Sequence, residues 1–302
     1  SAAFDTVDHR ILLERIEHRI GIKGTCLAWF KSYLQGRTQQ VAVKGAKSSE
    51  RLLSCGVPQG SVLGPKLFNI YVLPLGDIFK RHGIQYHLYA DDTSAYITFS
   101  DNELDQTTRK MQDLITDIGT WLYENMLKQN DEKTELIVFR SKQRQQLSVP
   151  PLQVGNDEVN ASETIKLLGV TSDNHMLMKK HVNMVSRACF YKLHNMFKIR
   201  KCITEEAAKT MIHGLITSRI DYCNSLFSGL PVTLLNKLEN VQRTAARLVS
   251  FTGKYDHITP VMKSLHWLPI KYRIEYKVLL LTYKALKAVL TPEGVIIVGH
   301  PF

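Results

Sequence analysis

Two adjacent carboxylates in the stretch Tyr89-Ala90-Asp91-Asp92 could hold divalent cations where a phosphoryl-transfer reaction needs them. Hard cations such as Mg²⁺ prefer oxygen ligands, and two of them about 3.5–4 Å apart stabilise the attacking and leaving oxygens of an in-line displacement. Apolar residues alternate with polar ones on both sides of the pair, at Ile84, Tyr86, Leu88, Ala95, Ile97 and Phe99. This alternation predicts two strands in a hairpin with the acids at its tip. An ordinary solvated turn is the alternative for the pair alone.

A glycine-rich loop at residues 56–64 (GVPQGSVLG) precedes an apolar segment with helical spacing. Pro65 suits a first helical position, and one buried face is predicted for Leu67, Phe68, Tyr71 and Leu75. Glycine lets the backbone approach a ligand closely, and amides at a helix start favour phosphate. An ordinary loop before a buried helix is the alternative for this segment alone.

Three ordered segments resemble the polymerase motifs of reverse transcriptases, in particular those of animal non-LTR retrotransposons of the jockey-like, LINE-type group. The matching segments are residues 1–9 (SAAFDTVDH) for the end of motif A, 58–61 (PQGS) for motif B and 89–92 (YADD) for motif C. The resemblance continues at residues 130–135 (NDEKTE) for motif D and 166–170 (KLLGV) for motif E. It covers nearly the whole chain and implies an RNA-directed DNA polymerase.

The resemblance implies catalytic roles for several residues. Asp91 and Asp92 would be metal ligands for two Mg²⁺ ions, with Mn²⁺ as an alternative, although Asp92 could instead serve only the turn. Lys133 would protonate the departing pyrophosphate as a general acid, with an ordinary solvated lysine as the alternative. The primer grip, which positions the primer terminus, would consist of Lys166, Leu167, Leu168, Gly169 and Val170.

The resemblance also implies a site for the incoming deoxynucleotide. Phe4 would be a steric gate that excludes a ribose 2′-hydroxyl, and core packing is its alternative role. Gln59 would hydrogen-bond the sugar of the nucleotide, Gly60 would let the backbone approach it, and Tyr89 would line the same site.

One departure from the family pattern concerns motif A. The family has a metal-binding aspartate five residues before the aromatic that corresponds to Phe4, which falls two positions before Ser1. We therefore expect a fragment that is inactive by itself. Asp5 follows the aromatic, so we expect it to cap the helix that carries Leu12 and Ile16. The alternative to the enzyme is a catalytically inactive nucleic-acid-binding relic or a co-opted scaffold.

The expected fold is α+β, with a right-hand polymerase palm (an antiparallel sheet with helices) followed by a helical thumb and with the fingers largely missing. We expect the palm with motifs A to D at residues 1–140, the end of the palm with the primer grip at 141–180, and the thumb with a C-terminal helical region at 181–302. Apolar stripes predict helices at 182–196, 234–248 and 274–285.

Other patterns predict the elements around the motifs. Alternation from Val41 to Cys55 predicts a hairpin ahead of the glycine-rich loop, and residues 136–139 resemble a further strand. Ser100 with Glu103 matches a capping box at the start of a long helix. Residues 167–170 are expected to form a short strand or a tight hairpin.

The net charge of +11 is unevenly distributed along the 302 residues. Residues 1–140 carry 17 basic and 17 acidic side chains, whereas residues 141–302 carry 22 and 11. A basic half predicts a polyanionic partner with salt-dependent affinity. The resemblance names the partners as an RNA template, a DNA primer, dNTPs and the endonuclease region of the same parent polyprotein.

Five scattered cysteines without metal-ligand spacing are typical of a reduced intracellular protein without structural zinc. No apolar run is long enough to cross a bilayer, so we expect no membrane association. Nuclear localisation is expected from the family alone.

Overall fold

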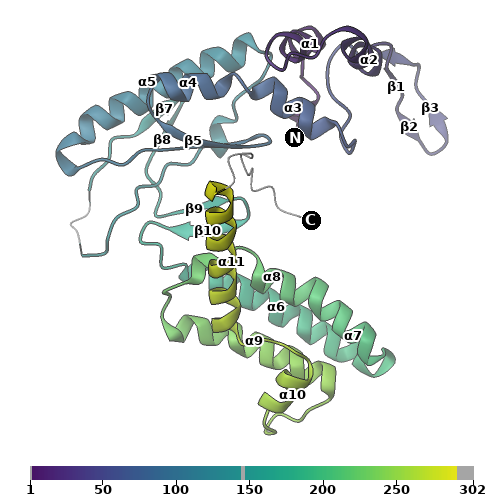
Figure 1. Cartoon of the computed structure of the whole chain (residues 1–302), viewed down its shortest axis with the longest axis vertical. Coiled ribbons are helices and arrows are strands. Elements are labelled where there is room, and N and C mark those ends of the chain that lie inside the picture. The colour runs from purple at the N-terminus through teal and green to yellow at the C-terminus, as the bar shows by residue number, and fades with distance from the viewer. Residues whose placement is uncertain (1, 144–146, 291–302) are drawn as a thin grey trace. The chain divides into compact units, whose positions relative to one another are not determined.

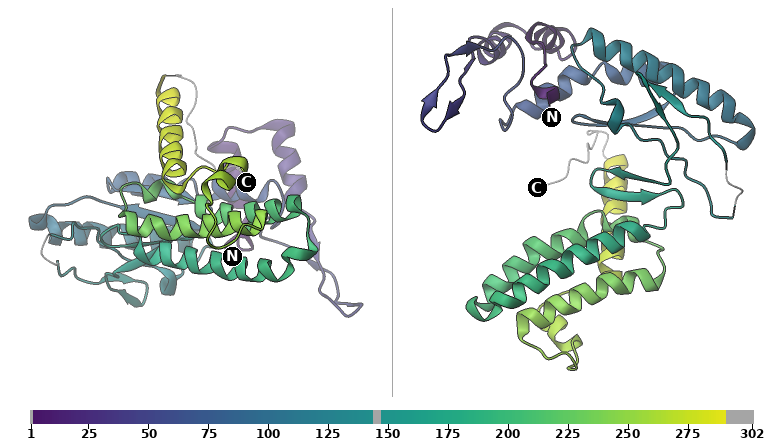
Figure 2. Two further views of the ribbon diagram at one scale, coloured as in Figure 1. Left: turned by 90° about the horizontal axis from the view of Figure 1, so that it is seen from below. Right: turned by 180° about the vertical axis from the view of Figure 1, so that it is seen from behind.

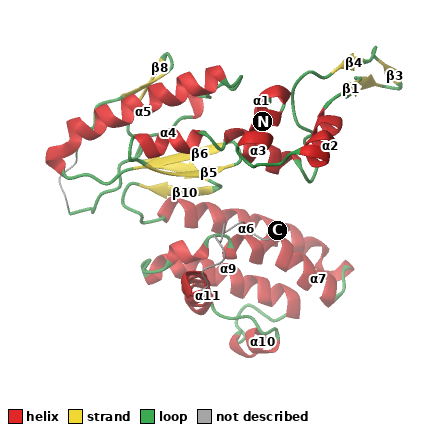
Figure 3. Ribbon diagram, turned by 45° about the horizontal axis from the view of Figure 1, so that its top comes forward, coloured by secondary structure: helices red, strands yellow, loops and turns green. Residues whose placement is uncertain are grey.

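The computed structural model describes residues 2–143 and 147–290, which form two compact units (Figure 1). The first unit contains residues 1–136 and 144–162, and the second contains residues 137–143 and 163–302. Helices alternate with small antiparallel sheets of two strands each (Figure 3). The fold class is therefore α+β, as expected.

The first unit begins with helices that pack around one apolar core. A short 3₁₀ turn at Ala2–Phe4 leads to α1 (His9–His18) and α2 (Gly24–Leu34), and α3 (Gly64–Val72) packs against α1. The core of these helices includes Val7, Leu12, Ile16, Leu34, Leu67, Phe68 and Tyr71, all nearly inaccessible to solvent.

The expected hairpin between α2 and the glycine-rich loop is present. Strand β1 (Thr38–Gln39) pairs with β4 (Arg51–Leu52), and β2 (Ala42–Val43) pairs with β3 (Ala46–Lys47). Lys44 and Gly45 form the tip, and both have left-handed backbone conformations. We name residues 38–52 the basic hairpin, because Lys44, Lys47 and Arg51 lie on it.

A second apolar core of the first unit supports the hairpin that carries the two carboxylates. Helix α4 (Leu75–Arg81) and the long α5 (Leu104–Glu124) pack together and against β5 (Gln85–Tyr89), which pairs with β6 (Asp92–Tyr96). Strand β7 (Leu152–Val154) lies against α5 and pairs with β8 (Asp157–Val159). Gln112 on α5 makes two hydrogen bonds with the backbone of Gln153, at 2.8 and 2.9 Å.

The second unit is mainly helical after one hairpin. Strands β9 (Thr164–Leu167) and β10 (Val170–Asp173) precede α6 (Lys179–Ile199), as expected for residues 167–170. Helix α7 (Glu205–Ile212), a π-helical turn (His213–Thr217) and α8 (Ser218–Asp221) follow without interruption. Helix α9 (Val232–Ser250) packs against α6 and α7, and then come α10 (Thr259–Ser264) and α11 (Ile270–Leu290). The three predicted helices are therefore present.

Three sequence expectations about local structure are wrong. Residues 136–139 form no strand, because only Leu136 finds a partner, in a single bridge to Ala161. Leu75 does not continue α3, because the helix ends at Val72 and α4 begins beyond Pro74. The cap of α1 is Asp8 and not Asp5. The Asp8 carboxylate accepts a 2.9 Å hydrogen bond from the backbone N–H of Ile11.

Candidate polymerase site

The two carboxylates lie at the tip of the β5–β6 hairpin, as predicted. Tyr89 pairs with Asp92 in the antiparallel register, so Ala90 and Asp91 form the two-residue turn. Ala90 has a φ of 52°, a conformation that few residues other than glycine adopt. Asp91 and Asp92 are both exposed, and Tyr89 is 54% exposed. Two oxygen donors are therefore presented to solvent on a short, well-paired hairpin.

Packing against α4 fixes the position of this hairpin. The ring of Tyr86 on β5 stacks on Phe79 of α4, with ring centroids 4.6 Å apart and planes 16° from parallel. A β-carbon on Gly76 would lie 2.4 Å from the Tyr86 hydroxyl, so this position on α4 has no room for a side chain. Ile84, immediately before the strand, is also buried. The acidic tip thus extends from a rigid base.

The glycine-rich loop is bound directly to the segment that resembles motif A. The backbone N–H of Gly56 donates to the carbonyl oxygen of Val7, and that of Val57 donates to the carbonyl oxygen of Phe4, both at 2.8 Å. Gly56 has a φ of 90°, and a β-carbon there would lie 3.0 Å from the carbonyl oxygen of Asp5. Only glycine fits this close approach without strain. The two motifs therefore form one structural element.

A hydrogen bond between side chains links the same two segments. The Gln59 amide nitrogen donates to both carboxylate oxygens of Asp5, at 3.0 and 3.1 Å. The two residues are 54 positions apart, and sequence patterns did not indicate their contact. Asp5 therefore holds the side chain of Gln59, which the resemblance predicts to contact the sugar of the nucleotide.

The loop then closes into α3 through its own side chains and backbone. The Ser61 hydroxyl donates to the carbonyl oxygen of Pro58 at 2.8 Å and accepts from the backbone N–H of Gly64 at 2.9 Å. Gly60, which lies between Pro58 and Ser61 in the sequence, has a φ of 77°. A β-carbon added there would have no atom within 4 Å. An open, left-handed glycine leaves the backbone accessible, which a ligand contact at this position requires.

Phe4 is half-buried and lies against α3. Its ring stacks on Phe68 with centroids 4.6 Å apart and planes 22° from parallel. Core packing is thus one role of Phe4. The exposed part of its side chain leaves room for a second role. The role of Phe4 as a steric gate stays a prediction.

A buried polar network connects the helices beneath these loops. The Arg15 guanidinium donates to the carbonyl oxygen of Tyr71 and to the side-chain oxygen of Asn125, and it lies over the rings of Tyr71 and Trp121. The Tyr71 hydroxyl donates to the Asn125 carbonyl oxygen at 2.7 Å. Burial lowers the pKa of Arg15 and raises the pKa of Tyr71. This network joins α1, α3 and the end of α5.

Lys133 lies in a short 3₁₀ turn (Asp131–Lys133) and is exposed. The turn is closed by a backbone hydrogen bond from Lys133 to Asn130 at 3.1 Å. Asp131 lies against Gly155 in the β7–β8 turn, where a β-carbon would be 2.3 Å from its carboxylate oxygen. The side chain of Lys133 is available to an external group, and its role in catalysis stays a prediction.

In the second unit, the segment that resembles the primer grip forms the β9–β10 hairpin. Leu168 and Gly169 make the turn, with φ values of 45° and 83°. Val170 is buried beneath it, whereas Lys166, Leu167 and Leu168 are exposed. The hydroxyl of Tyr222 donates a 2.6 Å hydrogen bond to the Leu168 carbonyl oxygen, which holds the turn against the end of the α8 segment.

The base of the same hairpin is held by two further residues. The Asp173 carboxylate accepts hydrogen bonds from the backbone N–H groups of His175, Leu177 and Met178, at 2.7–3.2 Å, just before α6. The buried His181 ring accepts a 3.2 Å hydrogen bond from the backbone N–H of Thr171 at Nδ1, and burial lowers its pKa.

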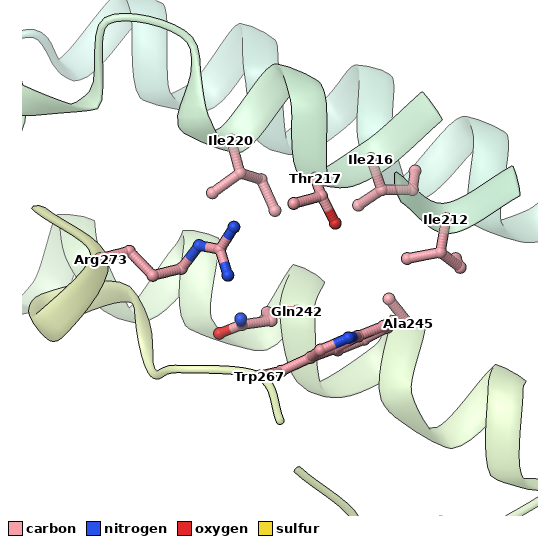
Figure 4. Close-up of a pocket in the computed structure, with 8 residues that line it drawn as sticks. All are labelled: Ile212, Ile216, Thr217, Ile220, Gln242, Ala245, Trp267 and Arg273. Atoms are coloured by element: carbon pink, nitrogen blue, oxygen red, sulfur yellow. The ribbon is translucent and has the colours of Figure 1, made fainter. Parts of the chain in front are cut away.

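One cavity in the second unit is too small for a substrate. It lies between the π-helical turn, α9 and α11, and Figure 4 shows Gln242, Trp267 and Arg273 around it. Its volume is about 10 Å³, which is room for about one water molecule.

The donor set at the hairpin tip suits a hard divalent cation only in part. Asp91 and Asp92 supply oxygen ligands, which Mg²⁺ prefers over nitrogen and sulfur. Residues 2–143 and 147–290 contain no group of three or more His, Cys, Asp or Glu side chains arranged to hold a metal ion. All five cysteines are free.

Within residues 2–143 and 147–290, no helix has the length and apolar character needed to span a bilayer.

Comparisons with known proteins agree with the motifs. Residues 1–172 match the family model described as "Reverse transcriptase (RNA-dependent DNA polymerase)". The chain is 28% identical over 272 residues to the probable RNA-directed DNA polymerase from transposon BS of Drosophila melanogaster, covering 87% of this chain and 30% of that protein. It is 29% identical over 244 residues to the RNA-directed DNA polymerase from mobile element jockey of the same species, covering 78% and 26%. The chain spans less than a third of the length of these relatives.

Proposed function

The chain belongs to the reverse transcriptase (RNA-dependent DNA polymerase) family, and from that premise we propose that it forms the palm and thumb of an RNA-directed DNA polymerase of a non-LTR retrotransposon. The observation that carries the proposal is the position of Asp91 and Asp92 at the two-residue turn of the β5–β6 hairpin. Packing against α4 fixes the base of this hairpin. The loop bound to the Phe4 segment supports it.

The reaction is attack by a primer 3′-hydroxyl on the α-phosphorus of a dNTP. A new P–O bond forms, the bond to the β-phosphate oxygen breaks, and pyrophosphate leaves as the 3′-hydroxyl proton is lost. Two Mg²⁺ ions, when bound, offset the negative charge that develops on the reacting oxygens. Asp91 and Asp92 would hold them, together with the motif A aspartate that the family has upstream of Phe4.

Residues of the first unit would position the nucleotide. Phe4, fixed by its stack on Phe68, would exclude a 2′-hydroxyl from the sugar. Gln59 and the open backbone at Gly60 would contact the nucleotide from the loop, and Asp5 would orient Gln59. Tyr89 would line the same site from β5, and the exposed Lys133 would protonate the departing pyrophosphate.

Residues of the second unit would hold the primer and the duplex. The β9–β10 hairpin would contact the primer terminus, and its turn is stabilised by Tyr222. The helices that follow would form the thumb. Residues 141–302 carry 22 basic against 11 acidic side chains, so they would attract the phosphate backbone. An RNA template and a DNA primer are the proposed partners, with the endonuclease region of the parent polyprotein and a nuclear location as further proposals from the family.

The test is primer extension on an RNA template with Mg²⁺ and dNTPs. We would compare this chain with a longer protein that also carries a fingers region and the motif A aspartate of the family. We expect extension by the longer protein and its loss in Asp91→Asn. The matched control is Asp113→Asn, which changes an exposed aspartate on α5 and should leave extension intact.

Two outcomes would contradict this assignment. Undiminished extension by Asp91→Asn would remove that carboxylate from the site. Inactivity of the longer protein, with duplex binding retained, would instead favour a nucleic-acid-binding scaffold that does not catalyse the reaction.

A further inference from the structure

An aromatic ladder on α2 lies outside the segments that resemble polymerase motifs. Trp29, Tyr33 and Arg37 are spaced four residues apart, so they follow one side of the helix and its exit. The Trp29 and Tyr33 rings stack with centroids 5.5 Å apart and planes 13° from parallel. The Arg37 guanidinium lies 5.8 Å from the centroid of the Tyr33 ring. We call these three residues the aromatic ladder.

The outer end of the ladder is open to solvent. Trp29 is 53% exposed, whereas Trp267 is 9% exposed and Trp121 is half-buried. A tryptophan is usually largely buried, so an exposed one indicates a contact surface. Phe30 meets the indole edge-on, with centroids 5.2 Å apart. The indole orientation is therefore set by its two neighbouring rings while much of its surface stays free.

The basic hairpin follows directly from the ladder. In the two views of Figure 2, as in Figure 1, the hairpin extends from α2 away from the other helices of the first unit. Lys44, Lys47 and Arg51 are exposed on it. The only acidic residue between positions 23 and 52 is Glu50, whose carboxylate accepts a 2.5 Å hydrogen bond from the Thr38 hydroxyl.

The segment of residues 23–52 is basic, although residues 1–140 as a whole carry no net charge. Residues 23–52 carry six basic side chains and one acidic one. Because residues 1–140 contain 17 of each, the remainder of that half has 11 basic and 16 acidic side chains. The positive charge of the first half is thus concentrated beside the aromatic ladder.

We propose that the aromatic ladder and the basic hairpin form a binding site for single-stranded nucleic acid. A base would stack on the free surface of Trp29, and the phosphates would follow Lys44, Lys47 and Arg51. Stacked aromatic rings beside a cationic groove are the features by which proteins bind single strands without reading their sequence. The cationic charge favours this occupant over a second copy of the chain, because two such hairpins would repel each other.

The proposal deepens the polymerase function, on which its biological use rests, since a template strand is unpaired before it is copied. Binding itself requires no catalysis. The site would hold unpaired template at a surface separate from the carboxylates, so it could retain the template between rounds of nucleotide addition.

The experiment measures binding of a 12-nucleotide fluorescein-labelled oligouridine by this chain. Trp29→Ala should weaken binding about 5- to 100-fold, as expected for loss of one base stack. Trp29→Phe should restore most of the affinity, because it keeps an aromatic surface. Tyr123→Ala is the matched control, since Tyr123 is 84% exposed on α5 and lies outside both the ladder and the hairpin.

The charge contribution has its own readout. Lys44→Ala with Lys47→Ala should reduce the slope of log affinity against log salt by about 1.4, or about 0.7 for each lost phosphate contact. The basic second unit contributes background binding in every variant, and the chain has three tryptophans, so the Trp29 contribution is the difference between the parent chain and Trp29→Phe in the quenching of tryptophan fluorescence by unlabelled oligouridine. Circular dichroism should be unchanged in all variants.

Two results would overturn the proposal. The first is equal affinity of Trp29→Ala and the parent chain for oligouridine, together with equal quenching of tryptophan fluorescence in Trp29→Phe and the parent chain. The second is concentration-dependent dimerisation, lost in Trp29→Ala, without oligouridine binding at this surface. Failure of primer extension by the longer protein, with Trp29-dependent binding intact, would count against the polymerase function and not against this site.

Discussion

The Gln59 side-chain amide donates hydrogen bonds to both carboxylate oxygens of Asp5, at 3.0 and 3.1 Å. These residues belong to the two segments that resemble motifs B and A. Backbone hydrogen bonds from Gly56 and Val57 to the same region make the loop and the Phe4 segment a single unit. A change in the position of Asp5 would therefore move the loop expected to contact the nucleotide.

We predict that Asp5→Ala raises the KM for dNTP in the longer protein proposed above for primer extension. Loss of this exposed charge-assisted contact should cost about 0.5–1 kcal/mol, which is about two- to fivefold in KM. A double-mutant cycle with Gln59→Ala measures the coupling, and the neighbouring Thr6→Ala is the control. Additive effects of Asp5→Ala and Gln59→Ala would show that the two side chains act independently.

We predict that Arg15→Met destabilises the first unit by about 2–3 kcal/mol, because it leaves the oxygens of Tyr71 and Asn125 buried without their charged donor. Hydrogen exchange of the α1 and α3 amides measures this locally, which avoids assuming that the two units unfold together. Arg19→Met, at the C-cap of the same helix, is the control. Its ion pair with Asp77, at 2.8 Å, joins side chains that are about half exposed, and should contribute less than about 1 kcal/mol.

We predict that the second unit loses stability as the pH falls below about 6.5, the usual pKa of histidine in an unfolded chain. The folded-state pKa of His181 is lowered by burial, so the unfolded state binds more protons between the folded and unfolded pKa values. The contribution of neutral His181 to stability is present above the pKa that histidine has in the unfolded state. It is lost as the pH falls toward the pKa of His181 in the folded state. Hydrogen exchange of α6 amides between pH 8 and 5 checks this.

His181→Gln is the comparison for that titration. Glutamine can still accept the hydrogen bond from the Thr171 backbone but cannot be protonated in this range. The pH dependence of the variant should be shallower than that of the parent chain. Equal pH profiles would assign the titration to another of the eleven histidines.

Local sequence patterns predicted the elements whose stabilising contacts are also local. The β5–β6 hairpin follows from alternation on both sides of a two-residue turn, and the capping box at Ser100 has both of its expected hydrogen bonds. Each depends on residues only a few positions apart.

The contacts that assemble the site are distant in sequence and were missed for that reason. Asp5 was expected to cap α1, but the 3₁₀ turn at Ala2–Phe4 delays the helix start, so Asp8 becomes the cap and Asp5 is left to bind Gln59. Tyr222 and Leu168 are likewise 54 positions apart. The apolar residues 136–139 indicated a strand, but a strand also needs a partner, which a local apolar run does not reveal.

We predict that Phe4→Val increases incorporation of ribonucleotides relative to deoxynucleotides by the longer protein, about tenfold or more, because the space for a 2′-hydroxyl opens. Phe68→Leu is the control, since it removes the ring on which Phe4 stacks but keeps Phe4 itself. That variant should lower stability with a smaller change in sugar preference. An unaltered preference in Phe4→Val would leave core packing as the role of this residue.

We predict that Tyr222→Phe raises the KM for primer–template and leaves the KM for dNTP unchanged. The variant loses the hydroxyl that donates to the Leu168 carbonyl oxygen, so the turn at Leu168 and Gly169, whose residues both have positive φ, should become less well ordered. Loss of one such hydrogen bond, about 0.5–1.5 kcal/mol, corresponds to a KM for primer–template about two- to tenfold higher, with the KM for dNTP unchanged. Tyr191→Phe, at a 70% exposed tyrosine on α6, is the matched control. An equal rise in both KM values would point to a general loss of structure, and no rise would separate the β9–β10 turn from primer binding.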